Sequence, residues 1–166
     1  MAMDSTALMD IYGRKLLEEL QRNARLSLAA LGRRVGLSPT ATAERLKQME
    51  EVGIVHGYTV EIDREALGLE VMAFIRMRCG GQNYRRLLEY VQTLEEVREC
   101  HHLTGSDDFL LKVTTMDMAV LEALIEALLP YGNPVTSLVL SSPVERRRYA
   151  VMGKLVTVTR KQSRKR

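Results

Sequence analysis

Hydroxyl, amide and cationic side chains are interspersed with apolar ones between residues 33 and 48. Ser38 is placed to cap a helix that begins with Pro39, where a missing N–H costs nothing. One face of that helix is left with short hydroxyls and cations, which suit phosphates and base edges in a DNA major groove. Alternatively, Arg45 and Lys47 simply solvate an exposed face and pair with Glu44 or Glu51. The residues expected to contact DNA are Arg33, Arg34, Ser38, Pro39, Thr40, Thr42, Arg45 and Lys47.

A second polar cluster lies in a loop between two apolar runs. Gly105 allows a tight turn in which backbone N–H groups can approach a carboxylate, and an aspartate such as Asp108 can hold an ammonium group. An amino acid carries both charges, so it fits this chemistry, although a plain hairpin loop has the same spacing. The polar groups that such a ligand would meet are those of Thr104, Gly105, Ser106, Asp107 and Asp108, with a hydroxyl from Ser137 on another strand, but spacing alone favours the plain loop.

Composition favours an ordinary soluble globular protein of one or two domains. The 166 residues are 46% hydrophobic and 27% charged. Because no apolar run reaches about 18 residues and the first residues lack a cationic region followed by an apolar one, we expect a cytoplasmic protein. Cys79 and Cys100 are the only cysteines. We expect both to be reduced, with no metal site and no cofactor, although Cys100 beside His101 and His102 would be half of a metal-ligand set.

Charge is distributed unevenly along the chain. From Pro143 onward, nine basic residues stand against Glu145 alone, so this end carries +8 and the remainder −5. Such a basic tail can attract nucleic acid, because each neutralised phosphate releases counterions. A solvated and partly disordered end is the alternative.

Two short helices are predicted around the first polar cluster. Ser27 can cap a helix with Leu28, Leu31 and Val35 on one face, and Gly36 supplies its left-handed stop. The second helix would bury Ala43, Leu46 and Met49 and end at Gly53. An earlier helix from about Asp10 to Asn23 would cover their apolar side, which completes a trihelical DNA-binding module.

The chain beyond residue 53 changes from helical periodicity to alternation, with an extended linker or hairpin first. Strands are expected over residues 70–79, 97–103, 109–115 and 135–142, and helices over 83–94 and from Asp117 to just before Pro130. The order β-α-β-β-α-β is ferredoxin-like, with both helices on one face of a four-stranded sheet and the other face free to pack on a second copy.

The complete pattern resembles the Lrp/AsnC family of bacterial and archaeal transcription regulators. The residues that carry the resemblance are LLEELQRNAR (16–25), VGLSPTATAERLKQMEEVGIVHGYTVEID (35–63), Ala66-Leu67-Gly68, VRECHHLTGSDDFLLKV (97–113) and VTSLVLSS (135–142). Three features depart from the usual pattern: Gly13 where aspartate is common, Ala24 where glycine is common, and the basic tail.

The resemblance implies an α+β fold, with a winged-type helix-turn-helix followed by a ferredoxin-like sensor domain. It implies a homodimer formed through the sheets and assembled further into tetramers or octamers, which bind double-stranded DNA and sense an amino acid through a glycine-x-x-aspartate loop that Gly105 and Asp108 match. The expected divisions are residues 1–53 for DNA binding, 54–65 as linker, 66–142 for effector binding and oligomerisation, and 143–166 as tail.

Two other functions fit parts of the sequence. A related group of haem-pathway decarboxylases resembles the same two-module plan and uses histidine, which makes His101 and His102 relevant. The chain lacks paired carboxylates, a nucleophile with its base, and a phosphate-cradling glycine loop, so we expect no enzyme. An architectural DNA-coating protein without effector is the other alternative, and the basic tail favours it.

Overall fold

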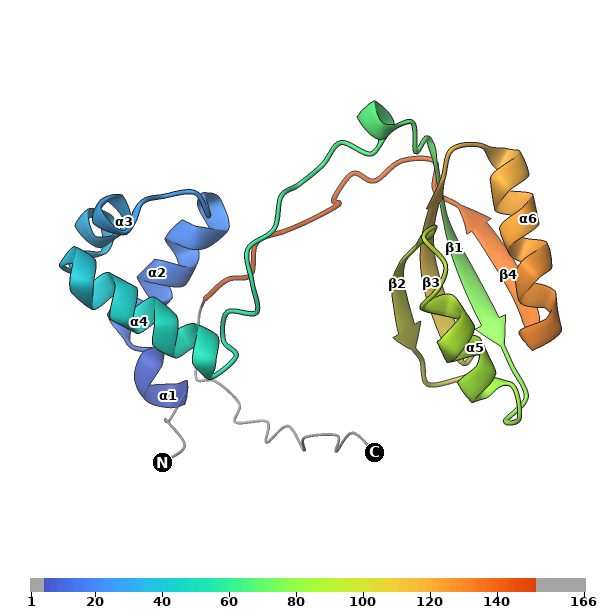
Figure 1. Cartoon of the computed structure of the whole chain (residues 1–166), viewed down its shortest axis with the longest axis horizontal. Coiled ribbons are helices and arrows are strands. Elements are labelled where there is room, and N and C mark those ends of the chain that lie inside the picture. The colour runs from blue at the N-terminus through green and yellow to red at the C-terminus, as the bar shows by residue number, and fades with distance from the viewer. Residues whose placement is uncertain (1–4, 152–166) are drawn as a thin grey trace. The chain divides into compact units, whose positions relative to one another are not determined.

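The computed structural model describes residues 5–151, which form two compact units (Figure 1). One unit runs up to Val60 and also contains the segment from Arg146, and the other spans Glu61–Glu145. The described part of the basic segment therefore belongs with the N-terminal unit, whereas the sequence suggested a separate tail. No helix within residues 5–151 is long and apolar enough to cross a membrane.

The N-terminal unit is helical, and its helices start where the sequence places capping side chains. The Ser27 hydroxyl accepts from Ala30 N and the Ser38 hydroxyl from Ala41 N, as predicted. Gly36 ends the third helix at φ 83°, a conformation that glycine adopts without steric cost. The helices are α1 (Ser5–Leu8), α2 (Ile11–Arg22), α3 (Leu28–Val35) and α4 (Pro39–Glu51).

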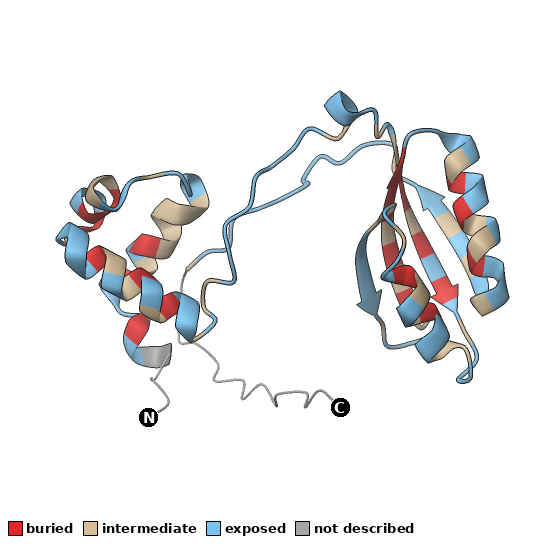
Figure 2. Cartoon of the chain, viewed as in Figure 1, coloured by how far each residue is buried: buried red, intermediate tan, exposed pale blue. Residues whose placement is uncertain are grey.

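The core of this unit brings α2, α3 and α4 together around buried leucines. Leu16, Leu31, Val35 and Leu46 form one buried cluster, which is drawn red in Figure 2. Leu28 differs from the prediction, because it lies at the first position of α3 and is 43% exposed. Residues 54–63 form no strand, so this segment does not supply the wing expected after α4.

Gly13 occupies a crowded position in the first turn of α2. A Cβ built there would lie 1.8 Å from the Leu8 carbonyl oxygen and 2.7 Å from Met49 Cε. Asp10 caps α2 instead, since its carboxylate accepts from Gly13 N at 2.9 Å.

The second unit is a four-stranded antiparallel sheet in the order β2-β3-β1-β4. Alternate residues of the central strand, Ala73, Ile75 and Met77, are buried against Leu87 and Leu121, so both long helices cover one face, as predicted. Short 3-10 turns η1 (Glu65–Leu67) and η2 (Leu129–Tyr131) connect the elements. The strands and helices are β1 (Val71–Arg78), α5 (Tyr84–Val91), β2 (Val97–His102), β3 (Phe109–Thr115), α6 (Met118–Leu128) and β4 (Asn133–Leu138).

The last strand is shifted from its predicted position. β4 begins at Asn133, which pairs with Arg78, and ends at Leu138, which pairs with Ala73. One further backbone bond joins Val139 N to Met72 O. The chain then leaves the sheet because β1 begins only at Val71 and offers no partner beyond it, and Leu140 is 96% exposed in spite of its apolar side chain.

Candidate DNA and effector sites

The start of α4 exposes several of the residues predicted to contact DNA. Ser38, Pro39, Thr40 and Lys47 are exposed. The N–H of Ala41 is bonded to the Ser38 hydroxyl and that of Thr42 to the Ser38 carbonyl. Because Pro39 has no N–H, Thr40 carries the amide of this turn that stays available to a phosphate.

Thr42 requires a correction, because its side chain is buried. It is fully inaccessible, and its hydroxyl donates to the Ser38 carbonyl at 2.8 Å. Its neighbour across the turn is Gly32, where an added Cβ would lie 2.9 Å from the Thr42 hydroxyl. Thr42 therefore joins Leu46 and Met49 in the buried stripe of α4, and its side chain cannot reach DNA.

Arg45 is also turned inward in this structure. Its guanidinium forms an ion pair with the Asp10 carboxylate, its side chain is 21% exposed, and its Nε is buried without a hydrogen-bond partner among the described residues. Arg45 thus joins the middle of α4 to the start of α2. Of the pairs expected from the sequence, Lys47 with Glu51 is present, whereas Arg45 pairs with Asp10 in place of Glu44 or Glu51.

The exposed face of α4 contains two polar residues that the sequence-based list left out. Gln48 Nε2 donates to Glu44 Oε1 at 2.9 Å, and Lys47 lies 3.8 Å from Glu51. Glutamine can pair with adenine and glutamate with cytosine in the major groove. Their spacing of four residues on the face opposite Leu46 is the sequence signal that identifies them.

The two arginines of α3 differ in their surroundings. Arg33 and Arg34 are both exposed, and Arg34 Nη1 lies 2.7 Å from Glu19 Oε2 on α2. The hydrogen bond from Arg34 is the largest cause that lowers the pKa of Glu19, with Arg22 adding to it. Arg34 is therefore partly neutralised, whereas Arg33 keeps its full charge for a phosphate.

The predicted effector loop is attached to the end of β1. Asp108 N donates to Met77 O at 2.8 Å, and Asp108 Oδ2 accepts from Cys79 N at 2.7 Å. Burial raises the pKa of the Cys79 thiol, and the Asp108 carboxylate raises it further. One oxygen of Asp108 thus holds the hairpin to β1, and the carboxylate has a structural role in addition to any contact with a ligand.

Asp107 lies near two arginines that the sequence-based list did not include. Its carboxylate oxygens are 3.9 Å from Arg76 and from Arg78, and Arg78 Nε also donates to the Ser106 carbonyl at 2.7 Å. Arg76 and Arg78 are two residues apart on a strand, so they share the face opposite the buried Ile75 and Met77. This spacing on a predicted strand is the signal that could have identified them.

The remaining predicted effector residues are placed differently. Thr104, Gly105 and Ser106 are exposed in the loop, and Gly105 has φ 121° with open space around its Cα. Ser137 is exposed on β4 and pairs with Phe74, three residues along β1 from Met77, which anchors the loop. The loop residues are thus gathered together, and Ser137 stands about 10 Å away along the sheet.

Within residues 5–151, no three or more His, Cys, Asp or Glu side chains lie close enough together to hold a metal ion. Cys79 and Cys100 are free thiols. His101 Nε2 instead lies 3.0 Å from Glu99 Oε2, and Lys112 Nζ is 3.1 Å from the other oxygen of the same carboxylate. His102 packs in an aromatic group with Tyr84 and Phe109, with ring centroids 5.3 Å from each.

Both units match known protein families. The family model for the AsnC-type helix-turn-helix domain covers residues 9–50, and the model for the Lrp/AsnC ligand binding domain covers residues 72–149. The transcriptional regulator LrpC of Bacillus subtilis is 33% identical over 133 residues, which are 80% of this chain and 92% of that protein. The leucine-responsive regulatory protein of Escherichia coli K12 is 35% identical over 120 residues, 70% of this chain and 73% of that protein.

Solved structures of transcriptional regulators also resemble this chain. A transcriptional regulator of Neisseria meningitidis in complex with L-Met superposes with a TM-score of 0.78 at 32% identity, over 84% of this chain and 95% of that one. The structure of B. subtilis LrpC has a TM-score of 0.74 at 33% identity, over 85% of this chain and 96% of that one. The matched relatives are named as regulators rather than enzymes.

Proposed function

Because the chain belongs to the Lrp/AsnC family of transcriptional regulators, we propose that it binds duplex DNA through α3 and α4 and responds to an amino acid. The observation that carries this proposal is the pairing, in one chain, of an exposed capped helix start with a charged loop at the end of β1. It would act in the cytoplasm, where a bacterial or archaeal chromosome lies.

The proposed DNA surface is the exposed start of α4 and the end of α3. Thr40, Lys47 and Gln48 would read base edges or phosphates in the major groove, while Ser38, Pro39 and Arg33 approach the backbone. Arg34 contributes more weakly because Glu19 neutralises part of its charge. Arg45 positions α4 from the inside through Asp10.

The proposed effector site is the loop of residues 104–108 together with Arg78. An amino acid has an α-ammonium, which Asp107 would hold as its main partner with the remaining oxygen of Asp108 beside it, and an α-carboxylate, which Arg78 and the exposed backbone beside Gly105 would hold. The L-Met in the Neisseria meningitidis regulator supports an amino acid as the class of ligand. Thr104, Ser106 and Ser137 would add hydroxyls from their exposed positions.

We also propose that the chain acts as a homodimer that assembles further into tetramers or octamers. The sheet face opposite α5 and α6 carries partly exposed apolar side chains, including Phe74, Leu110 and Val135. Packing of this face against a second copy would remove that apolar area from water. An effector that binds one assembly better than another would then shift the population between them.

A thermal-shift screen of the common amino acids tests the effector. A ligand at about 100 times its Kd stabilises the folded state by about 2.7 kcal/mol, which gives a clear rise in Tm. Asp107→Asn should abolish the shift, because it removes the charge and keeps the shape. Asp108→Asn should reduce the shift while it keeps an acceptor for Cys79 N. The proposal fails if the Asp107→Asn chain responds to the same amino acid as the parent.

The second candidate is an architectural protein that coats DNA without an effector, and the basic C-terminal segment favours it. It predicts equal affinity for all duplex sequences, a steep dependence on salt and no response to amino acids. Titration of an operator fragment and a shuffled duplex of equal length separates the two functions.

A further inference from the structure

Gln21 of α2 attaches the chain beyond the sheet to the helix-turn-helix unit. Gln21 Oε1 accepts from Tyr149 N at 2.7 Å, and Gln21 Nε2 donates to Tyr149 O at 3.1 Å. The backbone oxygen of Gln21 accepts from Arg148 Nε at 3.0 Å. Because one side-chain amide bonds both backbone groups of Tyr149, that residue is fixed in position and in orientation. These three hydrogen bonds are called the clasp below.

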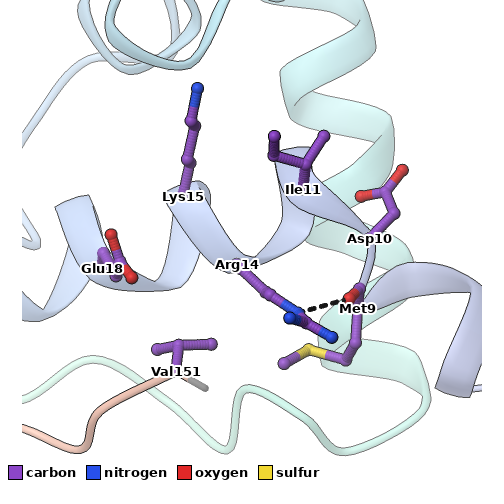
Figure 3. Close-up of a pocket in the computed structure, with 7 residues that line it drawn as sticks. All are labelled: Met9, Asp10, Ile11, Arg14, Lys15, Glu18 and Val151. Atoms are coloured by element: carbon purple, nitrogen blue, oxygen red, sulfur yellow. Dashed lines mark hydrogen bonds between the residues drawn. The ribbon is translucent and has the colours of Figure 1, made fainter. Parts of the chain in front are cut away.

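The attached segment continues along α2 toward the beginning of that helix. Val151 lies across a cleft of about 580 Å³ from the first half of α2 (Figure 3). The other residues that line the cleft are Met9, Asp10, Ile11, Arg14, Lys15 and Glu18. Residues 148–151 therefore follow α2 from Gln21 back toward Glu18, on the same unit that carries α3 and α4.

The clasp gives the two units a second connection. Residues 52–64 lead from α4 to η1, and residues 139–147 lead from β4 back to the clasp. Neither segment contains a helix or a strand. The chain thus leaves the helix-turn-helix unit once and returns to it once. While the clasp is closed, two lengths of chain join the units, and when it is open only residues 52–64 do.

The lengths of the two segments decide which one restrains the units more. An extended chain spans at most about 3.5 Å per residue, so the fourteen steps from Glu51 to Glu65 allow these residues to separate by up to about 50 Å. The ten steps from Leu138 to Arg148 allow only about 35 Å. The returning segment is the shorter of the two, so it sets the tighter limit as long as Arg148 and Tyr149 stay on Gln21.

We propose that residues 139–149 are a strap that restrains the helix-turn-helix unit relative to the second unit, and that the clasp at Gln21 keeps the strap closed. The three hydrogen bonds of the clasp are at exposed positions, where each is weak, so the clasp opens without unfolding either unit. An open clasp gives α3 and α4 a wider range of positions. The inference rests on the proposed function only in that the restrained unit is the one proposed to bind DNA.

Hydrogen exchange of the Tyr149 amide, measured by NMR, tests the clasp. This N–H donates to Gln21 Oε1, so Gln21→Leu, which keeps the size of the side chain and its preference for a helix, should speed the exchange about threefold to tenfold. Gln92→Leu, at an exposed glutamine of the second unit, is the matched control and should leave the rate unchanged. An unchanged rate in a folded Gln21→Leu chain overturns the clasp.

The distance between one spin label on each unit tests the strap. Cys100 on β2 is exposed and takes one label, and Ala41→Cys at the exposed start of α4 takes the other, in a chain with Cys79→Ser. Dilution with unlabelled chain restricts pulsed electron resonance to distances within one molecule. Gln21→Leu should widen the distribution of distances and add longer ones, because the limit of about 35 Å on the returning segment is removed. Gln92→Leu should leave the distribution as in the parent.

The outcomes separate the strap from the proposed function, because both measurements use the full chain without DNA or amino acid. Faster exchange at Tyr149 together with a wider distribution of distances supports the strap, even if the chain binds no duplex and the proposed function fails. A distribution that Gln21→Leu leaves unchanged overturns the strap, whether or not the chain binds DNA.

Discussion

Asp10 connects the start of α2 to the middle of α4, and its replacement should loosen the DNA-binding unit. Its carboxylate accepts from Gly13 N as the helix cap and also forms the ion pair with Arg45. We expect Asp10→Ala to lower the free energy of unfolding by about 2.5–3 kcal/mol, and Asp10→Asn, which keeps an acceptor for Gly13 N, by about 1.5–2 kcal/mol.

The magnitude follows from three contributions. Loss of an N-cap side chain costs about 1 kcal/mol. The ion pair contributes about 0.5–1 kcal/mol, a value reduced by solvent because the Asp10 side chain is 43% exposed and that of Arg45 21%. Leaving the partly buried guanidinium without its partner adds about 1 kcal/mol. The asparagine variant retains the first contribution, so it separates the cap from the charge.

Urea unfolding followed by far-UV circular dichroism measures these differences, and a double-mutant cycle with Arg45→Met isolates the pair. We expect a coupling energy of about 0.5–1 kcal/mol. Zero coupling would refute the contribution of the Asp10–Arg45 ion pair. An asparagine variant as unstable as the alanine variant would refute the contribution of the Asp10 cap. DNA binding gives an independent readout: Arg45→Met should weaken operator and random duplexes by a similar factor, whereas a selective loss on the operator would return Arg45 to the base-contacting set.

Two other substitutions test the packing and the charges of the fold. Gly13→Ala should destabilise the helix-turn-helix by about 1–3 kcal/mol, because the added Cβ meets the Leu8 carbonyl oxygen. Gly81→Ala is the control, since the space around Gly81 is open. A thermal melt in which both variants have the same Tm as the parent would contradict the close approach at Gly13. Hydrogen bonds from His101 and Lys112 lower the pKa of Glu99, so its ionised form adds stability that is present above its unfolded pKa of about 4.5 and lost as the pH falls through the lower folded value. Glu99→Gln should therefore flatten the fall of the urea midpoint below about pH 4.5, and an unchanged slope would show that this cluster does not contribute.

Local sequence signals predicted most of the helix starts and the buried faces of the sheet. Ser27, Ser38 and Asp117 cap helices through bonds to residues three positions later, which is an interaction within one turn. Alternation along residues 71–77 identified the buried face of β1 because a strand places every second side chain on the same side. These features depend on neighbours in the chain, so a sequence alone contains them.

The residues that were misplaced depend on partners far away in the chain. Thr42 looks like a surface residue, but its hydroxyl is satisfied within the helix by Ser38 O, which lets it pack where Gly32 leaves room. Arg45 and Asp10 are 35 positions apart, and the attachment of Tyr149 to Gln21 spans 128. No local periodicity reports such pairs, and each of them changes which polar groups remain available to DNA or ligand.

The loop of residues 104–108 also depends on a partner that is distant in the chain. Asp107 balances Arg76 and Arg78, which lie on the sheet face that we propose to pack against a second copy. An α-ammonium that binds Asp107 would leave both guanidiniums without that carboxylate, and an α-carboxylate beside Arg78 would restore only part of the balance. Asp108 bonds the loop to Met77 and Cys79. A change of charge in the loop would therefore act on the end of β1, to which the loop is attached. If these proposals hold, the charge on the proposed interface would depend on whether the loop is occupied, and an effector would act directly on the proposed assembly.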